Sequence, residues 1–184
     1  MSVTFPIDFD LIRKTVANAV KTATTLTCVL EEPKEQNFPR PVLPYFSFKL
    51  TTPAAKEGDD SLEYVSGTTY NRGGQRQMTI SFNCYSVTAE ESYKYMALWQ
   101  SSLETDTVQE ILRAKGIAIW LVGGVADLSK LLNTGYEGRA QMDVTFGIAS
   151  NIVEDLGRIS QVEIEGTVEA DGDEITQTFT VKES

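Results

Sequence analysis

Apolar residues recur at helical spacing in three stretches of the chain, and each stretch predicts a helix. Residues 8–23 place their apolar side chains on one face, and Asp8 stands at the positively charged start of this helix. Thr88–Glu91 has the spacing of a capping box, which predicts a second helix over 89–103. A short third helix is expected over 106–115. Helices with a single apolar stripe need another layer of structure to pack against.

Elsewhere apolar and polar residues alternate, and this period of two predicts strands. Strands are expected at 26–30, 45–52, 78–85, 117–122 and 139–149, with a more exposed one at 62–65. Residues 117–122 are apolar at every position, which suits a strand that is covered on both faces or lies at a packed edge. A C-terminal hairpin that turns at 171–174 is predicted from the alternating apolar residues Val162, Ile164, Val168, Ile175, Phe179 and Val181.

Polar and glycine-rich stretches predict the turns between these elements. Residues 53–60 are polar, with Gly58 marking a turn, and 67–77 form a glycine-rich loop. A phosphate-binding cradle is a weak alternative for this loop, because neither a Lys-Ser/Thr pair nor a helix follows it. Residues 127–132 are expected to form a single helical turn or an irregular segment.

Prolines at positions 39, 41 and 44 make residues 37–44 a stiff, extended connector. Proline has no backbone donor, so this segment cannot lie in the middle of a sheet. The strand predicted at 45–52 begins directly after it. A stiff segment that leads into a sheet is typical of a chain that presents a fixed shape to a partner, because it loses little entropy on docking.

Together these elements predict an α+β fold. We expect a single domain over 1–184, with a mostly antiparallel (mixed) β-sheet, two to three flanking helices and extended loops. Within it, 8–166 are predicted to form the core and 167–184 a C-terminal hairpin extension.

Composition narrows the range of functions. The chain of 184 residues has a net charge of -10, which argues against a surface that grips nucleic acid. It contains no histidine, which removes the usual general base and the histidine-dependent nucleophiles and metal sites. Cys28 and Cys84 lie in apolar strands and are expected to be buried free thiols. We therefore predict no catalytic, cofactor-binding or metal-binding residues.

No apolar run has the length of a membrane span, and the N-terminus lacks the pattern of a signal peptide. This indicates a protein that is made and folded in a reducing cytoplasm. Four arginines stand out in this acidic chain because each is expected in a loop or at a strand start: Arg40, Arg72, Arg76 and Arg139. Surface solubility is one explanation. Ion pairing with an acidic patch on a neighbouring subunit is the other, since arginine is the favoured interface cation.

The segment from Asn37 to Tyr45 resembles the Q-n-x-P-R-P-x-x-P-Y signature of tailed-phage neck and tail-terminator proteins. Three later features are similar to that family in order and spacing, and the resemblance extends over about 8–166. These features are the strand 77–85 with the helix 89–103, the strand start Arg139–Asp143, and Glu154–Ile159 leading into Val162–Gly166.

The resemblance implies a structural virion protein without catalytic residues. Such a protein is expected to form a ring, typically six-fold, that caps the tail tube, stops its polymerisation and docks the tail to the head connector. The implied partners are further copies of the chain, the tail tube protein, neck or connector proteins and, as a further candidate, the sheath. DNA would pass through the lumen without specific binding, and no membrane is involved.

The same resemblance places the protein at the head–tail junction of the virion, after assembly in the cytoplasm of the host bacterium. It favours Arg40 and Tyr45 as contact residues, and together with the argument for interface arginines the sequence predicts six side chains that contact neighbouring subunits or partners. These residues are Phe38, Arg40, Tyr45, Arg72, Arg76 and Arg139.

Two alternatives stay open on the sequence. One is a head-side neck or head-closure protein. The other belongs to a different class, a soluble host α+β domain that binds a ligand or acts as an enzyme, and a small molecule bound in a deep pocket would favour it.

Overall fold

A computed structural model describes residues 6–31, 40–132, 135–155, 161–170 and 173–182, the last two ranges as backbone. Contacts divide the chain into two compact units. The larger consists of Met1–Ser61 and Gly73–Ile152, and the smaller of Leu62–Arg72 and Val153–Ser184.

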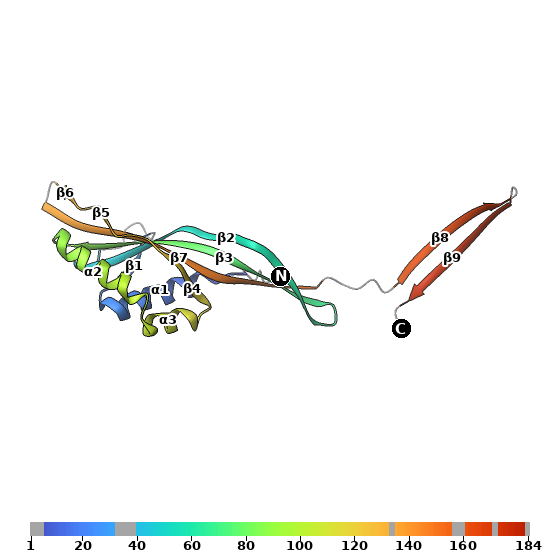
Figure 1. Cartoon of the computed structure of the whole chain (residues 1–184), viewed down its shortest axis with the longest axis horizontal. Helices are drawn as coiled ribbons and strands as arrows, with labels where there is room; N and C mark the ends of the chain where they lie inside the picture. The colour runs from blue at the N-terminus through green and yellow to red at the C-terminus, as the bar shows by residue number, and fades with distance from the viewer. Residues whose placement is uncertain (1–5, 32–39, 133–134, 156–160, 171–172, 183–184) are drawn as a thin grey trace. The chain divides into compact units, whose positions relative to one another are not determined.

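A mixed sheet with three helices on one side forms the larger unit (Figure 1). The strands follow the order β1-β2-β3-β7-β4, with β5 and β6 also paired to β7. β1 runs parallel to β2, whereas β4, β5 and β6 run antiparallel to β7. This confirms the predicted α+β class. The strand bounds are Cys28–Leu30 for β1, Tyr45–Ser66 for β2, Thr69–Ser86 for β3, Ile117–Val122 for β4 and Gly135–Asp155 for β7.

The three predicted helices are confirmed as α1 (Phe9–Thr24), α2 (Ala89–Ser102) and α3 (Asp106–Arg113). α1 begins where the Asp8 carboxylate accepts a hydrogen bond from the Leu11 N–H at 2.9 Å. α2 begins in the same way, because the Thr88 hydroxyl accepts from the Glu91 N–H at 3.3 Å. Each cap satisfies a backbone donor that has no partner inside its helix.

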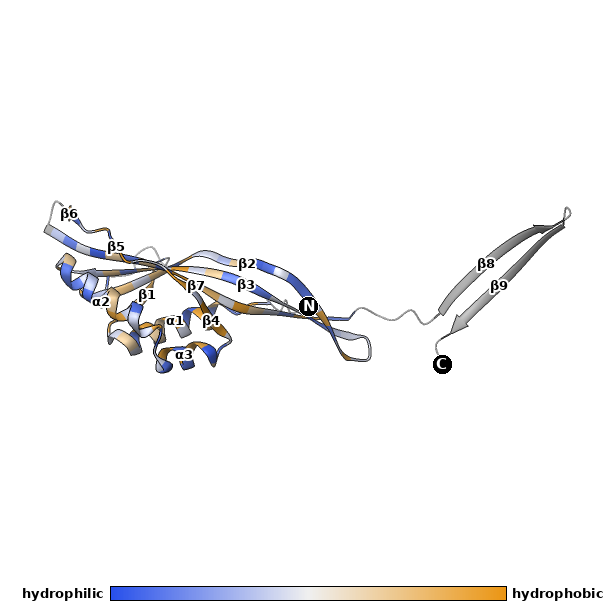
Figure 2. Cartoon of the chain, in the orientation of Figure 1, coloured by the Kyte–Doolittle hydropathy of each residue, from blue (hydrophilic) through white to orange (hydrophobic). Residues whose placement is uncertain are grey.

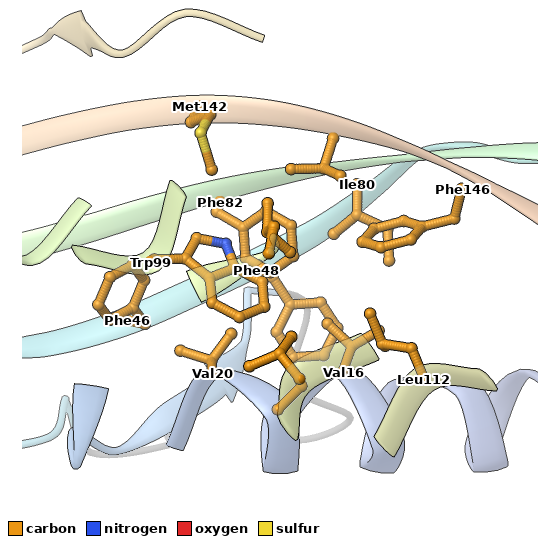
Figure 3. Close-up of a cluster of buried hydrophobic side chains, with 14 of the residues drawn as sticks. Val16, Val20, Phe46, Phe48, Ile80, Phe82, Trp99, Leu112, Met142 and Phe146 are labelled. Carbon is orange, nitrogen blue, oxygen red and sulfur yellow. The ribbon is translucent and has the colours of Figure 1, made fainter. Parts of the chain in front are cut away.

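Aromatic residues fill the space between the sheet and the helices (Figure 3). Phe46 and Phe48 of β2 and Phe82 of β3 point from the sheet toward Trp99 of α2, and the Phe82 and Trp99 ring centroids lie 5.3 Å apart. Burying each such side chain contributes about 1.5–3 kcal/mol to stability. The alternating residues of the predicted strands therefore do form the core. From the helix side it is closed by Val16 and Val20 of α1 and Leu112 of α3.

β2 and β3 are longer than the sequence pattern predicts. The predicted turn at Gly58 and the predicted loop over 67–77 are both wrong, because the two strands continue to a turn at Gly67, whose φ is 56°. Residues 51–61 of β2 are largely hydrophilic (Figure 2), so they lack the alternation that reveals a half-buried strand. Gly74 lies in β3 against Asp60 and Arg76, where a Cβ would collide with both side chains. The absence of a side chain at Gly74 thus allows the Asp60–Arg76 pair to pack closely against β3, and Gly74 does not form a turn.

The helical turn or irregular segment expected at 127–132 is also wrong. Two short strands, β5 (Ala126–Asp127) and β6 (Lys130–Leu132), pair with β7 there. Between them, the Ser129 hydroxyl accepts a hydrogen bond from the Arg139 N–H at 2.9 Å. These strands are too short to show any periodicity, so only the pairing with β7 defines them.

The smaller unit contains the predicted C-terminal hairpin, formed by β8 (Gln161–Ala170) and β9 (Asp173–Lys182). These two strands make a sheet of their own. The same unit includes the turn between β2 and β3, where Tyr64 and Tyr70 meet edge to face with ring centroids 5.6 Å apart. The hairpin prediction is confirmed.

Gly138 of β7 lies close against the start of α2, because a Cβ there would overlap the Thr88 carbonyl. We expect Gly138→Ala to lower the free energy of unfolding by about 1–3 kcal/mol, since backbone must move to admit the methyl group. Urea denaturation measures this change. Gly124→Ala is the matched control, because nothing lies within 4 Å of its Cβ position. Equal effects of the two substitutions would contradict the predicted overlap.

Candidate functional site

Three of the predicted contact residues come together around one tyrosine of β3. The Tyr45 and Tyr85 rings stack with centroids 5.0 Å apart and planes 18° from parallel. The guanidinium carbons of Arg40 and Arg139 lie 5.9 Å and 5.3 Å from the centre of the Tyr85 ring, within cation–π range. We call Arg40, Tyr45, Tyr85 and Arg139 the arginine–tyrosine cluster. Its members come from three strands and from the segment that precedes β2.

Hydrogen bonds fix both arginines of the cluster. Arg139 donates from Nε and Nη2 to Asn83 Oδ1 at 3.1 Å and 2.9 Å, and the Asn83 amide donates to Glu31 at 3.4 Å. Arg40 donates to Glu137 Oε2 at 3.0 Å. The ion pair and the Tyr85 ring therefore hold the residue that precedes Pro41 against the sheet.

The cluster combines permanent positive charge with neutral aromatic rings. Burial raises the pKa of both Tyr45 and Tyr85, so their hydroxyls stay protonated at neutral pH. Tyr45 and Glu137 raise the pKa of Arg40, which keeps its charge. The Arg40 side chain is 72% exposed, whereas Tyr45 is buried. Arg40 is thus the member of the cluster that can reach a partner, and Tyr45 supports it from within.

The other two predicted arginines lie in strand β3 and not in a loop, which corrects their predicted location. Arg76 donates to both oxygens of Asp60, at 2.8 Å and 3.2 Å. Arg72 is likewise paired, through Nε and Nη2, with the carboxylate of Glu154 at 2.9 Å and 3.3 Å. Both pairs are bidentate, so they align neighbouring strands within the chain. Phe38, the remaining predicted contact residue, lies outside the described residues.

The sequence did not indicate Asn83, Tyr85, Glu31 or Glu137 as parts of a site. Asn83 and Tyr85 alternate with apolar residues in β3, and this period does place them together on the polar face of the strand. Which residues face them from β7 depends on strand register, and the sequence does not reveal it. The role of the arginines in partner contacts stays a prediction.

The thiols are poor candidates for chemistry. Burial raises the pKa of Cys28 and of Cys84 to about 12, so neither forms the thiolate that a nucleophile requires. Both are free cysteines, as predicted. Among the residues that the structure describes, no group of three or more acidic or cysteine side chains could hold a metal ion. No helix within the described ranges is long and apolar enough to cross a membrane.

We expect both thiols of the native protein to react slowly with Ellman's reagent at pH 8, because this pH lies far below a pKa of about 12. In urea both should react at the rate of a small free thiol. The time course of absorbance at fixed reagent concentration gives both rates. Rapid reaction of a native thiol would show that its strand opens readily to solvent.

A comparison with known protein families identifies one family that the chain matches. A family model described as phage neck terminator protein matches residues 10–177, which is most of the chain. No curated protein matches the chain significantly. The matched range includes all but the first residue of α1, the arginine–tyrosine cluster and most of the C-terminal hairpin. The chain therefore belongs to the family of phage neck terminator proteins.

Proposed function

We propose that the protein forms a closed ring of identical subunits at the head–tail junction, with six-fold symmetry, that caps the tail tube and docks the tail to the head. The family match over 10–177 carries this proposal. Membership makes the protein a structural component of the phage neck, present in the virion and in contact with other neck and tail proteins. The ring, the capping of the tube and the docking extend that role.

The sheet offers contact surfaces that suit a ring. β1 and β4 are its two ends, so each presents an outer edge in the described part of the chain. A ring needs two different surfaces on every subunit, each complementary to the other. Backbone groups at a sheet edge can provide one of them, because they pair with any strand that approaches in register. Trp120 and Leu121 of β4 add exposed apolar area beside such an edge.

The segment that leads into β2 offers a second contact. Val42 is 90% exposed and follows Pro41, while Arg40 is anchored to Glu137 and Tyr85. A fixed backbone with an exposed apolar residue at its tip loses little entropy when a partner covers it. This supports Arg40 and its neighbours as contact residues, with the tail tube protein or the head connector as partners and the sheath as a further candidate.

The charge of the subunit suits a channel for DNA. A net charge of -10 on each copy repels phosphate, so DNA would pass through the lumen without specific binding. Assembly in the host cytoplasm agrees with the two free cysteines. A structural role also agrees with the absence of histidine from the sequence and with the raised pKa of both thiols.

Cryo-electron microscopy of purified virions tests this function. We expect density for a six-fold ring of this protein directly at the end of the tail tube, because a terminator must contact the last tube ring. An affinity tag labelled with gold locates the subunit independently. Density on the head side of the connector would replace the proposal with a head-closure role, and absence of the protein from virions would refute both.

Arg40→Ala should separate assembly from folding. The Arg40 side chain is 72% exposed, although Glu137 is only 14% exposed, so loss of this ion pair should change the free energy of unfolding by about 1 kcal/mol or less. Incorporation into virions should nevertheless fall, because the segment before β2 loses its anchor. Lys94→Ala is the matched control, since Lys94 is also 72% exposed and pairs with one carboxylate, that of Glu90. Quantitative mass spectrometry of particles measures incorporation, and equal values for the two variants would contradict the predicted role.

A further inference from the structure

The C-terminal hairpin has one apolar face that needs a cover. In the register of β8 and β9, apolar residues stand directly opposite apolar residues: Val162 and Val181, Ile164 and Phe179, Val168 and Ile175. Within each strand, the three apolar positions differ by an even number of residues, so they share one face of the strand. Because they also pair across the strands, all six positions lie on one face of the two-stranded sheet. An isolated two-stranded hairpin is at best marginally stable in water. Its apolar face therefore calls for further strands or a packing surface.

Strand β4 is an edge strand that could accept such further strands. It lies at the end of the sheet, so its outer backbone groups have no ladder partner among the described residues. Edge strands are normally protected by charged residues or proline, and β4 contains neither. A bulge at Trp120 interrupts its register with β7 and separates Ile117–Ile119, the longer regular stretch of the edge, from Leu121 and Val122. An added strand can pair with Ile117–Ile119.

A hollow adjoins this regular part of the edge. It has a volume of about 120 Å³ and is lined by α3 and β4, with Leu112, Ile117 and Ile119 among its lining residues. Because α3 covers one face of the sheet, a strand added beside β4 would have one face on the side of α3. An amphipathic hairpin in that position can direct its apolar face toward α3 and the hollow, and its polar face toward solvent.

Charge favours the same pairing. Residues 161–182 contain six carboxylates and one lysine, so the hairpin is strongly acidic and most of this acidic chain repels it. The stretch 111–125 is different, because it contains Arg113 and Lys115 and no carboxylate. Both cations are exposed, and both lie within the four residues before β4. The edge of β4 thus combines apolar character with a positive flank, which suits an acidic, amphipathic strand.

We propose that the β8–β9 hairpin of one copy adds to the β4 edge of the next copy. Each copy carries one hairpin and one β4 edge, so the contact is heterologous and can repeat around a ring. The inference rests on the proposed ring, and it names the two surfaces that join its subunits. Backbone hydrogen bonds to Ile117–Ile119 provide strand pairing, and the apolar face of the hairpin covers the hollow beside α3.

Site-specific photo-crosslinking tests this contact in the full-length chain. A benzophenone amino acid replaces Ala118, which is exposed in the regular part of the edge. Virions and concentrated purified protein are irradiated, separated by mass and analysed as peptides. We expect a species of twice the subunit mass in which position 118 is joined to a peptide from 161–182. The same amino acid at Ala97, exposed on α2, is the matched control and should not give this product.

A second variant tests the apolar face. Ile164→Ser with Phe179→Ser, which removes one cross-strand pair, should abolish the crosslink from position 118. A crosslink within one chain, a crosslink to another protein or to another segment, or no crosslink from position 118 would each overturn the proposal. Images of the same particles distinguish this failure from failure of the proposed function, because a ring without the crosslink refutes only the hairpin contact. If the protein is absent from virions, the ring proposal fails. The crosslink from position 118 in concentrated purified protein then tests the hairpin contact by itself.

Discussion

Strand β7 is the constraint on which the larger unit depends, because it pairs along both of its sides. On one side it binds β3, and on the other it binds β6, β5 and β4 in turn. This double pairing brings Arg139 opposite Asn83 and Tyr85, and it presses Gly138 against the start of α2. It also leaves β4 as the last strand of the sheet. Both the arginine–tyrosine cluster and the open edge therefore follow from the position of one strand.

The core was the most predictable part of the fold. Apolar side chains at helical spacing and at alternating positions leave water together, and the same residues that carry the pattern, such as Val16, Phe48 and Phe82, are the buried ones. The caps at Asp8 and Thr88 were predictable for a local reason, since a helix start needs a side-chain acceptor within a few residues. Local and periodic signals need no knowledge of the partner strand.

The parts that could not be predicted depend on partners distant in sequence. Residues 53–60 belong to a strand because β3 pairs with them, although both faces are hydrophilic and the pattern is absent. The cluster combines Arg40 with Glu137, which are 97 residues apart, and only the register of β7 joins them. Arginines expected to bind a neighbour were found paired within the chain for the same reason. Sequence spacing identifies which residues share a face, but not which face lies opposite.

The acidic charge of the subunit restricts which interactions can hold its copies together. Each copy carries a net charge of -10, so neighbouring copies repel one another, and salt only screens this repulsion. Arg72 and Arg76 are already paired within the chain, so an ion pair to a neighbour would replace an existing one and gain little. Backbone hydrogen bonds and apolar contacts form without separating these pairs. Sheet edges and exposed apolar residues are therefore the surfaces through which such a subunit can associate at the smallest cost in free energy.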